Sequence, residues 1–181
     1  MNTQFEGLKE MMAHQQGDAF NDALELLKSL DPSVETMVGD YIITLAFEKA
    51  AGWYIYEPNG ELRWVVPEEK DNLHLEVIVQ DANDLRFLPY LEVSVKLFDK
   101  NKELVGEKEQ EFIWHPMIWH YAENWQIPGP GEYFAEITVK EPTFRRHDQL
   151  RGQRYMMDAT IKLEPFEIPK SVIGQKPLGP E

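Results

Sequence analysis

Apolar residues near the start of the chain recur at the spacing of a helix. Within the stretch Phe5–Leu30 they form one stripe, made of Phe20, Leu24 and Leu27. The pair Asp31-Pro32 ends this pattern and Gly17 interrupts it, because proline and glycine both disfavour a helix interior. We therefore expect an N-terminal helical segment over residues 1–35, made of two short helices that break near Gly17.

After Val38 the apolar period falls to two, which is typical of half-buried antiparallel strands. Four stretches alternate in this way, and a further short strand is expected near the end, giving 41–47, 73–79, 91–97, 133–139 and 159–163. Turn sequences fit the same pattern, since Pro58-Asn59-Gly60 joins 53–56 to 62–66, and Asp99–Lys102 leads into 103–112. About seven or eight strands result, so the predicted fold class is mainly β: an immunoglobulin-like antiparallel β-sandwich over residues 36–165.

Two segments carry no regular apolar period. Residues 113–130 are predicted to form a long loop, which the sequence Pro128-Gly129-Pro130-Gly131 closes. Residues 166–181 contain repeated prolines and are predicted to be an extended or disordered tail.

Charge and composition exclude several classes of function. The chain has 181 residues and a formal net charge of −14, which argues against nucleic acid as a partner because phosphate binding needs a basic patch. It contains no cysteine, so disulfides, thiolate nucleophiles and cysteine-ligated metal sites are absent. No serine nucleophile motif is present either, and we expect a binding protein and not an enzyme.

The longest apolar runs, such as Tyr41–Phe47, are too short to cross a membrane, so the protein is not expected to be membrane-embedded. The first residues also lack the basic and apolar regions of a secretory signal. From the residues alone, a cytoplasmic location therefore stays open beside one in which a signal has been removed.

The stretch Trp114–Tyr121 is the densest in chemistry, with two histidines, a methionine and three aromatic residues. Imidazole and thioether groups are ligands for transition metals, which makes Met117 and His120 candidates in a loop rimmed by aromatic rings. A small hydrophobic cluster that anchors the loop would explain the same residues. His115, beside a proline, is interpreted as peripheral.

Other candidate ligands lie far away along the chain. His74 and Glu76 occupy alternate positions of one predicted strand, so they share the face opposite its apolar residues, about 7 Å apart. His147 precedes Asp148, which could orient its ring. A simpler interpretation of His74 and Glu76 is a solvated strand face, and a simpler interpretation of His147 is a basic turn. Similarly, Met11, Met12 and His14 suit either a second soft metal site or an exposed helix face.

An ordered set of elements resembles a known family. The set comprises Leu73-His74-Leu75-Glu76, Leu88-Pro89-Tyr90-Leu91, Pro116-Met117, His120-Tyr121 with Asn124, Gly131-Glu132-Tyr133 and Arg146-His147-Asp148. Between about Gly39 and Leu163, it is similar to the periplasmic iron-transport accessory proteins of the P19 and Tp34 type.

The resemblance implies an immunoglobulin-like domain that binds copper or iron near the interface of a homodimer and acts in iron uptake with a membrane iron permease. It also implies a periplasmic or other extracytoplasmic location. The implied metal ligands are His74, Met117, His120 and His147, with Glu76 as an additional or alternative ligand. Three neutral imidazoles would make metal binding weaken as the pH falls through their pKa range.

Departures from the family pattern affect the ligand set. The family has a glycine after its His-Tyr pair, where this chain has Ala122-Glu123, and the Glu123 carboxylate could itself reach the ion. The spacing between Met117 and His120 is also shorter. An alternative function is an interaction module that binds a protein or a carbohydrate through the aromatic loop Trp114–Trp125.

Overall fold

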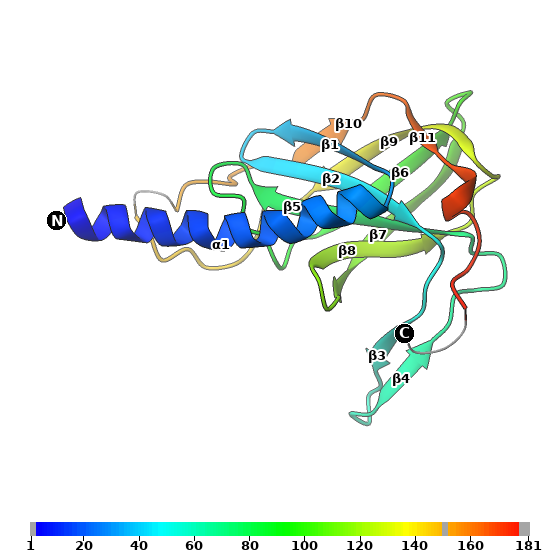
Figure 1. The fold of residues 1–181 in the computed structure, drawn as a ribbon, viewed down its shortest axis with the longest axis horizontal. Coiled ribbons are helices and arrows are strands. Elements are labelled where there is room, and N and C mark those ends of the chain that lie inside the picture. The colour runs from blue at the N-terminus through cyan, green and yellow to red at the C-terminus, as the bar shows by residue number, and fades with distance from the viewer. Residues whose placement is uncertain (1–2, 150–151, 178–181) are drawn as a thin grey trace.

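The computed structural model describes residues 3–149 and 152–177, with side chains from Glu6 onward. A long helix, α1 (Thr3–Leu30), precedes a β-rich body (Figure 1). The strands are β1 (Ser33–Val38), β2 (Tyr41–Glu48), β3 (Trp53–Tyr56), β4 (Leu62–Val65), β5 (Leu73–Asp81), β6 (Val93–Asp99), β7 (Leu104–Trp114), β8 (Trp119–Trp125), β9 (Gly131–Val139), β10 (Ala159–Lys162) and β11 (Phe166–Ile168). In this part of the chain, no helix is long and apolar enough to cross a membrane.

One antiparallel sheet, whose strand order differs from the sequence order, forms the body. Its order is β1-β2-β5-β8-β7-β6-β9-β10, with β11 also paired to β9, so it contains nine strands within the described residues. Strand β7 pairs with β6 over its first part and with β8 over its last, so it passes from one layer to the other. The nearly closed sheet thereby forms the two layers of a sandwich, and the fold prediction is confirmed.

The core lies between these layers. Residues at every second position of β6 and β9 are buried, as the apolar alternation predicts. They meet the inward side chains of β2, β5 and β8, including Leu45, Leu75, Tyr121 and Trp125.

Strand β5 is buried along its whole length, on both faces. Its outer face is covered by the second half of α1, because Leu24 and Leu27 pack there against Ala46, Ile78 and Ile118. His74 and Glu76 share this outer face, as predicted, but both side chains are buried.

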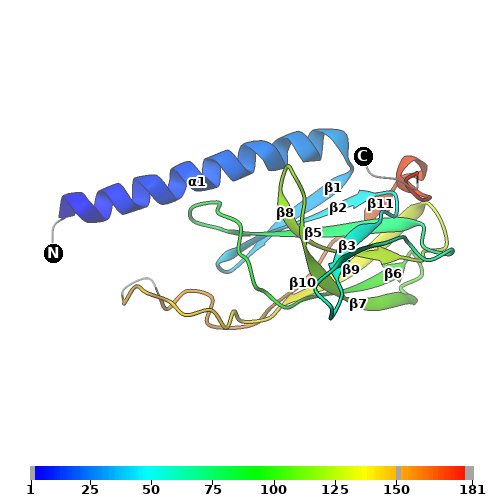
Figure 2. The ribbon, with the colours of Figure 1, turned by 90° about the horizontal axis from the view of Figure 1, so that it is seen from below.

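The predicted break at Gly17 is wrong, because α1 continues without interruption from Thr3 to Leu30. Gly17 is buried, and a Cβ atom there would lie 1.6 Å from the carbonyl oxygen of Asp84. The glycine therefore allows the helix to touch the loop after β5, which is a packing role and not a helix-breaking one. The half of α1 before this contact projects beyond the sandwich (Figures 1 and 2).

The predicted loop 113–130 contains a central strand instead, β8. It lies between β5 and β7, and both of its faces are covered, so its apolar residues do not alternate with exposed polar ones. The candidate ligand His120 thus lies on a rigid strand.

The predicted extended or disordered tail, 166–181, packs on the core over its first part, and residues 178–181 lie outside the described part of the chain. Phe166 and Ile168 of β11 and Val172 of the following 3-10 turn (Lys170–Val172) are buried in the main core. Further along, the amide of Lys176 donates to the carbonyl of Ala50. The sequence of this segment shows no regular apolar pattern because only a few of its side chains reach the core.

The short hairpin β3–β4 forms as the turn Pro58-Asn59-Gly60 predicts, as a two-stranded sheet of its own. It projects from one end of the sandwich (Figure 1). Its first residue, Trp53, lies beside His74, with 5.9 Å between the ring centres.

Candidate metal centre

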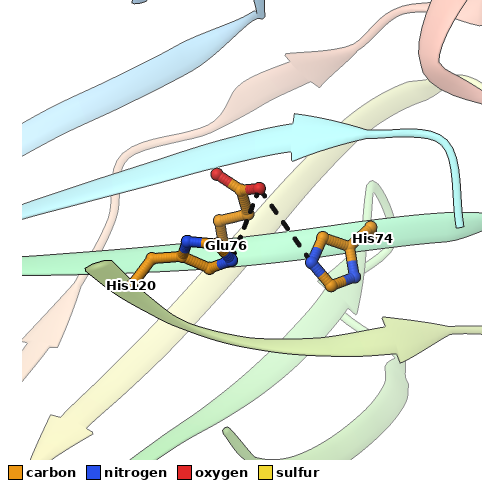
Figure 3. A group of neighbouring side chains, drawn as sticks. All are labelled: His74, Glu76 and His120. Carbon is orange, nitrogen blue, oxygen red and sulfur yellow. Dashed lines mark ion pairs between the residues drawn. The ribbon is translucent and has the colours of Figure 1, made fainter. Parts of the chain in front are cut away.

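Three predicted ligands meet on the outer face of the β5–β8 pair. The carboxylate oxygen Oε1 of Glu76 lies 3.9 Å from Nε2 of His74 and 3.7 Å from Nε2 of His120 (Figure 3). These side chains are 6%, 3% and 3% exposed. Among the described residues they form the one group of three or more histidine, aspartate or glutamate side chains whose ligand atoms all lie within 4.8 Å of one another.

Strand pairing explains why they meet. Glu76 is paired with Ala122 and His74 with Asn124, so His120 lies two positions from the partner of Glu76 on the same face. Residues that are 44 positions apart are thus brought together by register, and a one-residue slip would send His120 into the core.

Asn124 fixes the ring of His74. Its amide nitrogen donates to the carbonyl of Ala51 at 2.8 Å, and its oxygen accepts from the Ala51 amide at 3.2 Å. That oxygen also lies 3.0 Å from Nδ1 of His74, so Nδ1 carries the proton and Nε2 presents its electron pair to Glu76. Sequence spacing could have indicated this role, since Asn124 lies four residues after His120 on a strand and therefore on the same face.

His120 is held differently. Its Nδ1 atom is buried and has no hydrogen-bond partner within the described part of the chain. The backbone of Ile118 raises the pKa of this ring slightly, against the larger effect of burial, but no hydrogen bond of regular geometry holds Nδ1 as Asn124 holds that of His74.

Burial shifts the pKa values of all three groups toward their neutral forms. Desolvation lowers the pKa of His74 to about 4 and that of His120 to about 3, and the neighbouring histidines add to the shift of His120. Desolvation, with the negative charges of Glu48 and Asp31, raises the pKa of Glu76 to about 8. At neutral pH the site therefore holds two neutral imidazoles and a protonated carboxyl group, and a cation would displace the Glu76 proton.

Met117 and His115 lie in the turn between β7 and β8. Met117 is partly buried against the cluster that contains Leu24 and Leu27. The ring of His115, which we predicted to be peripheral, is centred 6.3 Å from that of His120. Sequence spacing did not reveal this proximity because the stretch was expected to be a loop, whereas the hairpin folds His115 back toward the strand.

Two other candidates lie elsewhere. Glu123 is on the opposite face of β8 from His120 and accepts a hydrogen bond from the amide of Asn124 at 2.7 Å, so it is not part of the group. His147 is exposed and lines a separate surface pocket with His14, between α1 and the segment after β9. One chain alone does not bring His147 to the other predicted ligands. Met11 and Met12 are about half exposed on α1.

A buried pair of imidazoles with a carboxylate is the donor set of a transition-metal site, here carried by an antiparallel β-sandwich. The family model described as Fe2+ transport protein matches residues 56–160, which include every predicted ligand, and the chain belongs to this family.

Solved structures of the same fold come from two organisms. FetP of uropathogenic Escherichia coli strain F11 superimposes with a TM-score of 0.60 at 18% identity, over 76% of this chain and 94% of that one. Copper-reconstituted P19 of Campylobacter jejuni gives 0.62 at 15% identity, over 81% of this chain and 98% of P19. A copper-bound variant of FetP gives 0.59 at 18% identity, over 76% and 95%. No curated protein matches the sequence.

Proposed function

We propose that this chain binds one transition-metal ion, iron or copper, as cargo in iron uptake or metal handling. His74 and His120 would bind it through Nε2 and Glu76 through its carboxylate, with the thioether of Met117 as a further ligand. The protein binds and releases the ion without catalysing a reaction in this proposal.

The observation that carries the proposal is the burial of the three ligand groups around one point. Two neutral imidazoles and a carboxyl group could instead have been exposed at lower cost, since each loses its hydration when buried. An ion at their centre compensates all three losses at once. Family membership and the copper-bound relatives support the same function.

The wider biology follows the family resemblance and is part of the proposal. We propose that the protein acts in the periplasm or another extracytoplasmic compartment, as a homodimer, together with a membrane iron permease. In such a homodimer, His147 would join the site only from the second copy, because within one chain it lines the pocket beside His14.

The alternative function, binding a protein or carbohydrate through Trp114–Trp125, has less support. This stretch is largely strand β8, and Tyr121 and Trp125 are buried in the core. Only Trp114 and Trp119 among its four large aromatic rings are substantially exposed, at 63% and 43%.

Calorimetric titration of the metal-free protein tests the function. We expect saturable binding of one Cu2+ or, without oxygen, one Fe2+ per chain, and no comparable binding of Mg2+ or Ca2+, because imidazole ligands do not suit those hard cations. Equal, weak binding of all four ions would show that only the acidic surface is titrated, and it would contradict the proposal.

A further inference from the structure

The ring of His115 lies beside one member of the buried trio, His120. Its ring centre is 6.3 Å from that of His120, compared with 6.1 Å between His120 and His74. Because a bond from a metal to an imidazole nitrogen is about 2 Å long, two rings on one ion have centres no more than about 6.5 Å apart. The separation of His115 and His120 lies within this limit, which is the geometric requirement for one ion to contact both rings.

His115 also connects the trio to solvent. It is half-buried and flanked by the exposed residues Trp114 and Pro116, whereas the trio is at most 6% exposed. At the other end of the site, Trp53 packs beside His74, and an indole offers no electron pair to a metal. Of these two neighbours, His115 is the one that could contact an ion from outside.

His120 is the trio histidine whose Nδ1 atom is not held by a hydrogen bond. The Nδ1 atom of His74 is fixed by Asn124, whereas the Nδ1 atom of His120 is buried without a partner. A rotation of the His120 ring toward His115 thus breaks no hydrogen bond at this atom.

The contact of His115 with an ion would be exchangeable. Its Nδ1 accepts a hydrogen bond from the amide of Met117 at 3.2 Å, and its own amide donates to the carbonyl of Ile118 at 3.2 Å. An ion on Nδ1 would occupy the electron pair that accepts the hydrogen bond from the Met117 amide. An ion on Nε2 would move the ring proton to Nδ1, so either mode breaks the bond from Met117.

We propose that His115 is a transfer ligand for the cargo ion. It contacts the incoming ion at the surface, passes it by way of His120 to the inner site of His74, Glu76 and His120, and contacts it again on release. Only metal–ligand bonds form and break, and the oxidation state of the ion does not change. This inference rests on the proposed metal-binding function.

The substitution His115→Asn separates transfer from a purely structural role. An asparagine oxygen can accept the amide of Met117 as Nδ1 does, so the turn is kept while the imidazole is lost. The matched control is His14→Asn, which removes an exposed histidine from α1. Stopped-flow mixing with Cu2+, and then with a chelator, measures loading and release.

We expect His115→Asn to load and release copper about tenfold more slowly, with one ion per chain and nearly parental affinity. His14→Asn should match the parent in every respect. Parental rates in His115→Asn would show that the residue only shapes the turn, and a loss of equilibrium affinity without a change in loading rate would make it a permanent ligand; either result overturns the transfer role. A parent protein that binds no copper overturns the proposed function as well.

Discussion

The His120→Ala variant will bind Cu2+ at least about a hundredfold more weakly than the parent, because it loses one of two imidazoles in a site with three close ligands. We expect the fold to persist, since alanine removes a buried ring whose Nδ1 atom has no hydrogen-bond partner in the described structure. Calorimetric titration gives the affinity, and circular dichroism checks the fold.

One control substitution and one diagnostic substitution complete this experiment. His14→Ala removes an exposed histidine on α1 and should leave the affinity unchanged. His147→Ala should also leave it unchanged if one chain builds the whole site, whereas a loss as large as that of His120→Ala would show that a second copy supplies His147. Parental affinity in His120→Ala itself would place the metal elsewhere.

Copper affinity will rise about tenfold per pH unit between pH 6 and pH 8 and level off above pH 8. The cause is Glu76, whose pKa is raised to about 8 by burial, so the empty site must lose this proton to accept an ion. The histidines contribute little in this range, because their pKa values of about 4 and 3 keep them neutral. The weakening through histidine protonation that the sequence suggests is thereby moved below about pH 5.

Titrations at pH 7 in two buffers of different ionisation enthalpy will count the released proton, and we expect close to one per ion. In Glu76→Gln this release disappears and the affinity becomes nearly independent of pH between pH 6 and pH 8. Glu123→Gln is the matched control, because that carboxylate lies on the other face of β8 and should keep the parental release. Unchanged proton release in Glu76→Gln would show that another group is displaced by the metal.

Sequence patterns predict the sandwich and most of its strands because β6 and β9 have one buried and one exposed face, which produces alternation. They do not predict β8, because a strand that is covered on both sides loses this signal. They also predict a helix break at Gly17 that does not occur. The role of this glycine depends on Asp84, a residue far along the chain that packs against the helix.

The same distinction applies to the site. His74 and Glu76 are predictable as a pair because their spacing alone places them on one face of β5. His120 joins this pair through the register of β5 with β8. Spacing along the chain does not predict this grouping, whereas the family resemblance does. The proximity of His115 depends on the turn between β7 and β8, and no periodic pattern encodes it.

The central claim is that one ion sits between His74, Glu76 and His120. Pulsed electron paramagnetic resonance of the protein loaded with one equivalent of Cu2+ tests it most directly, because it detects the remote nitrogens of bound imidazoles. We predict coupling to two imidazoles from the inner site, falling to one in His120→Ala and, separately, in His74→Ala. Spectra that are identical in the parent and both variants would contradict the account.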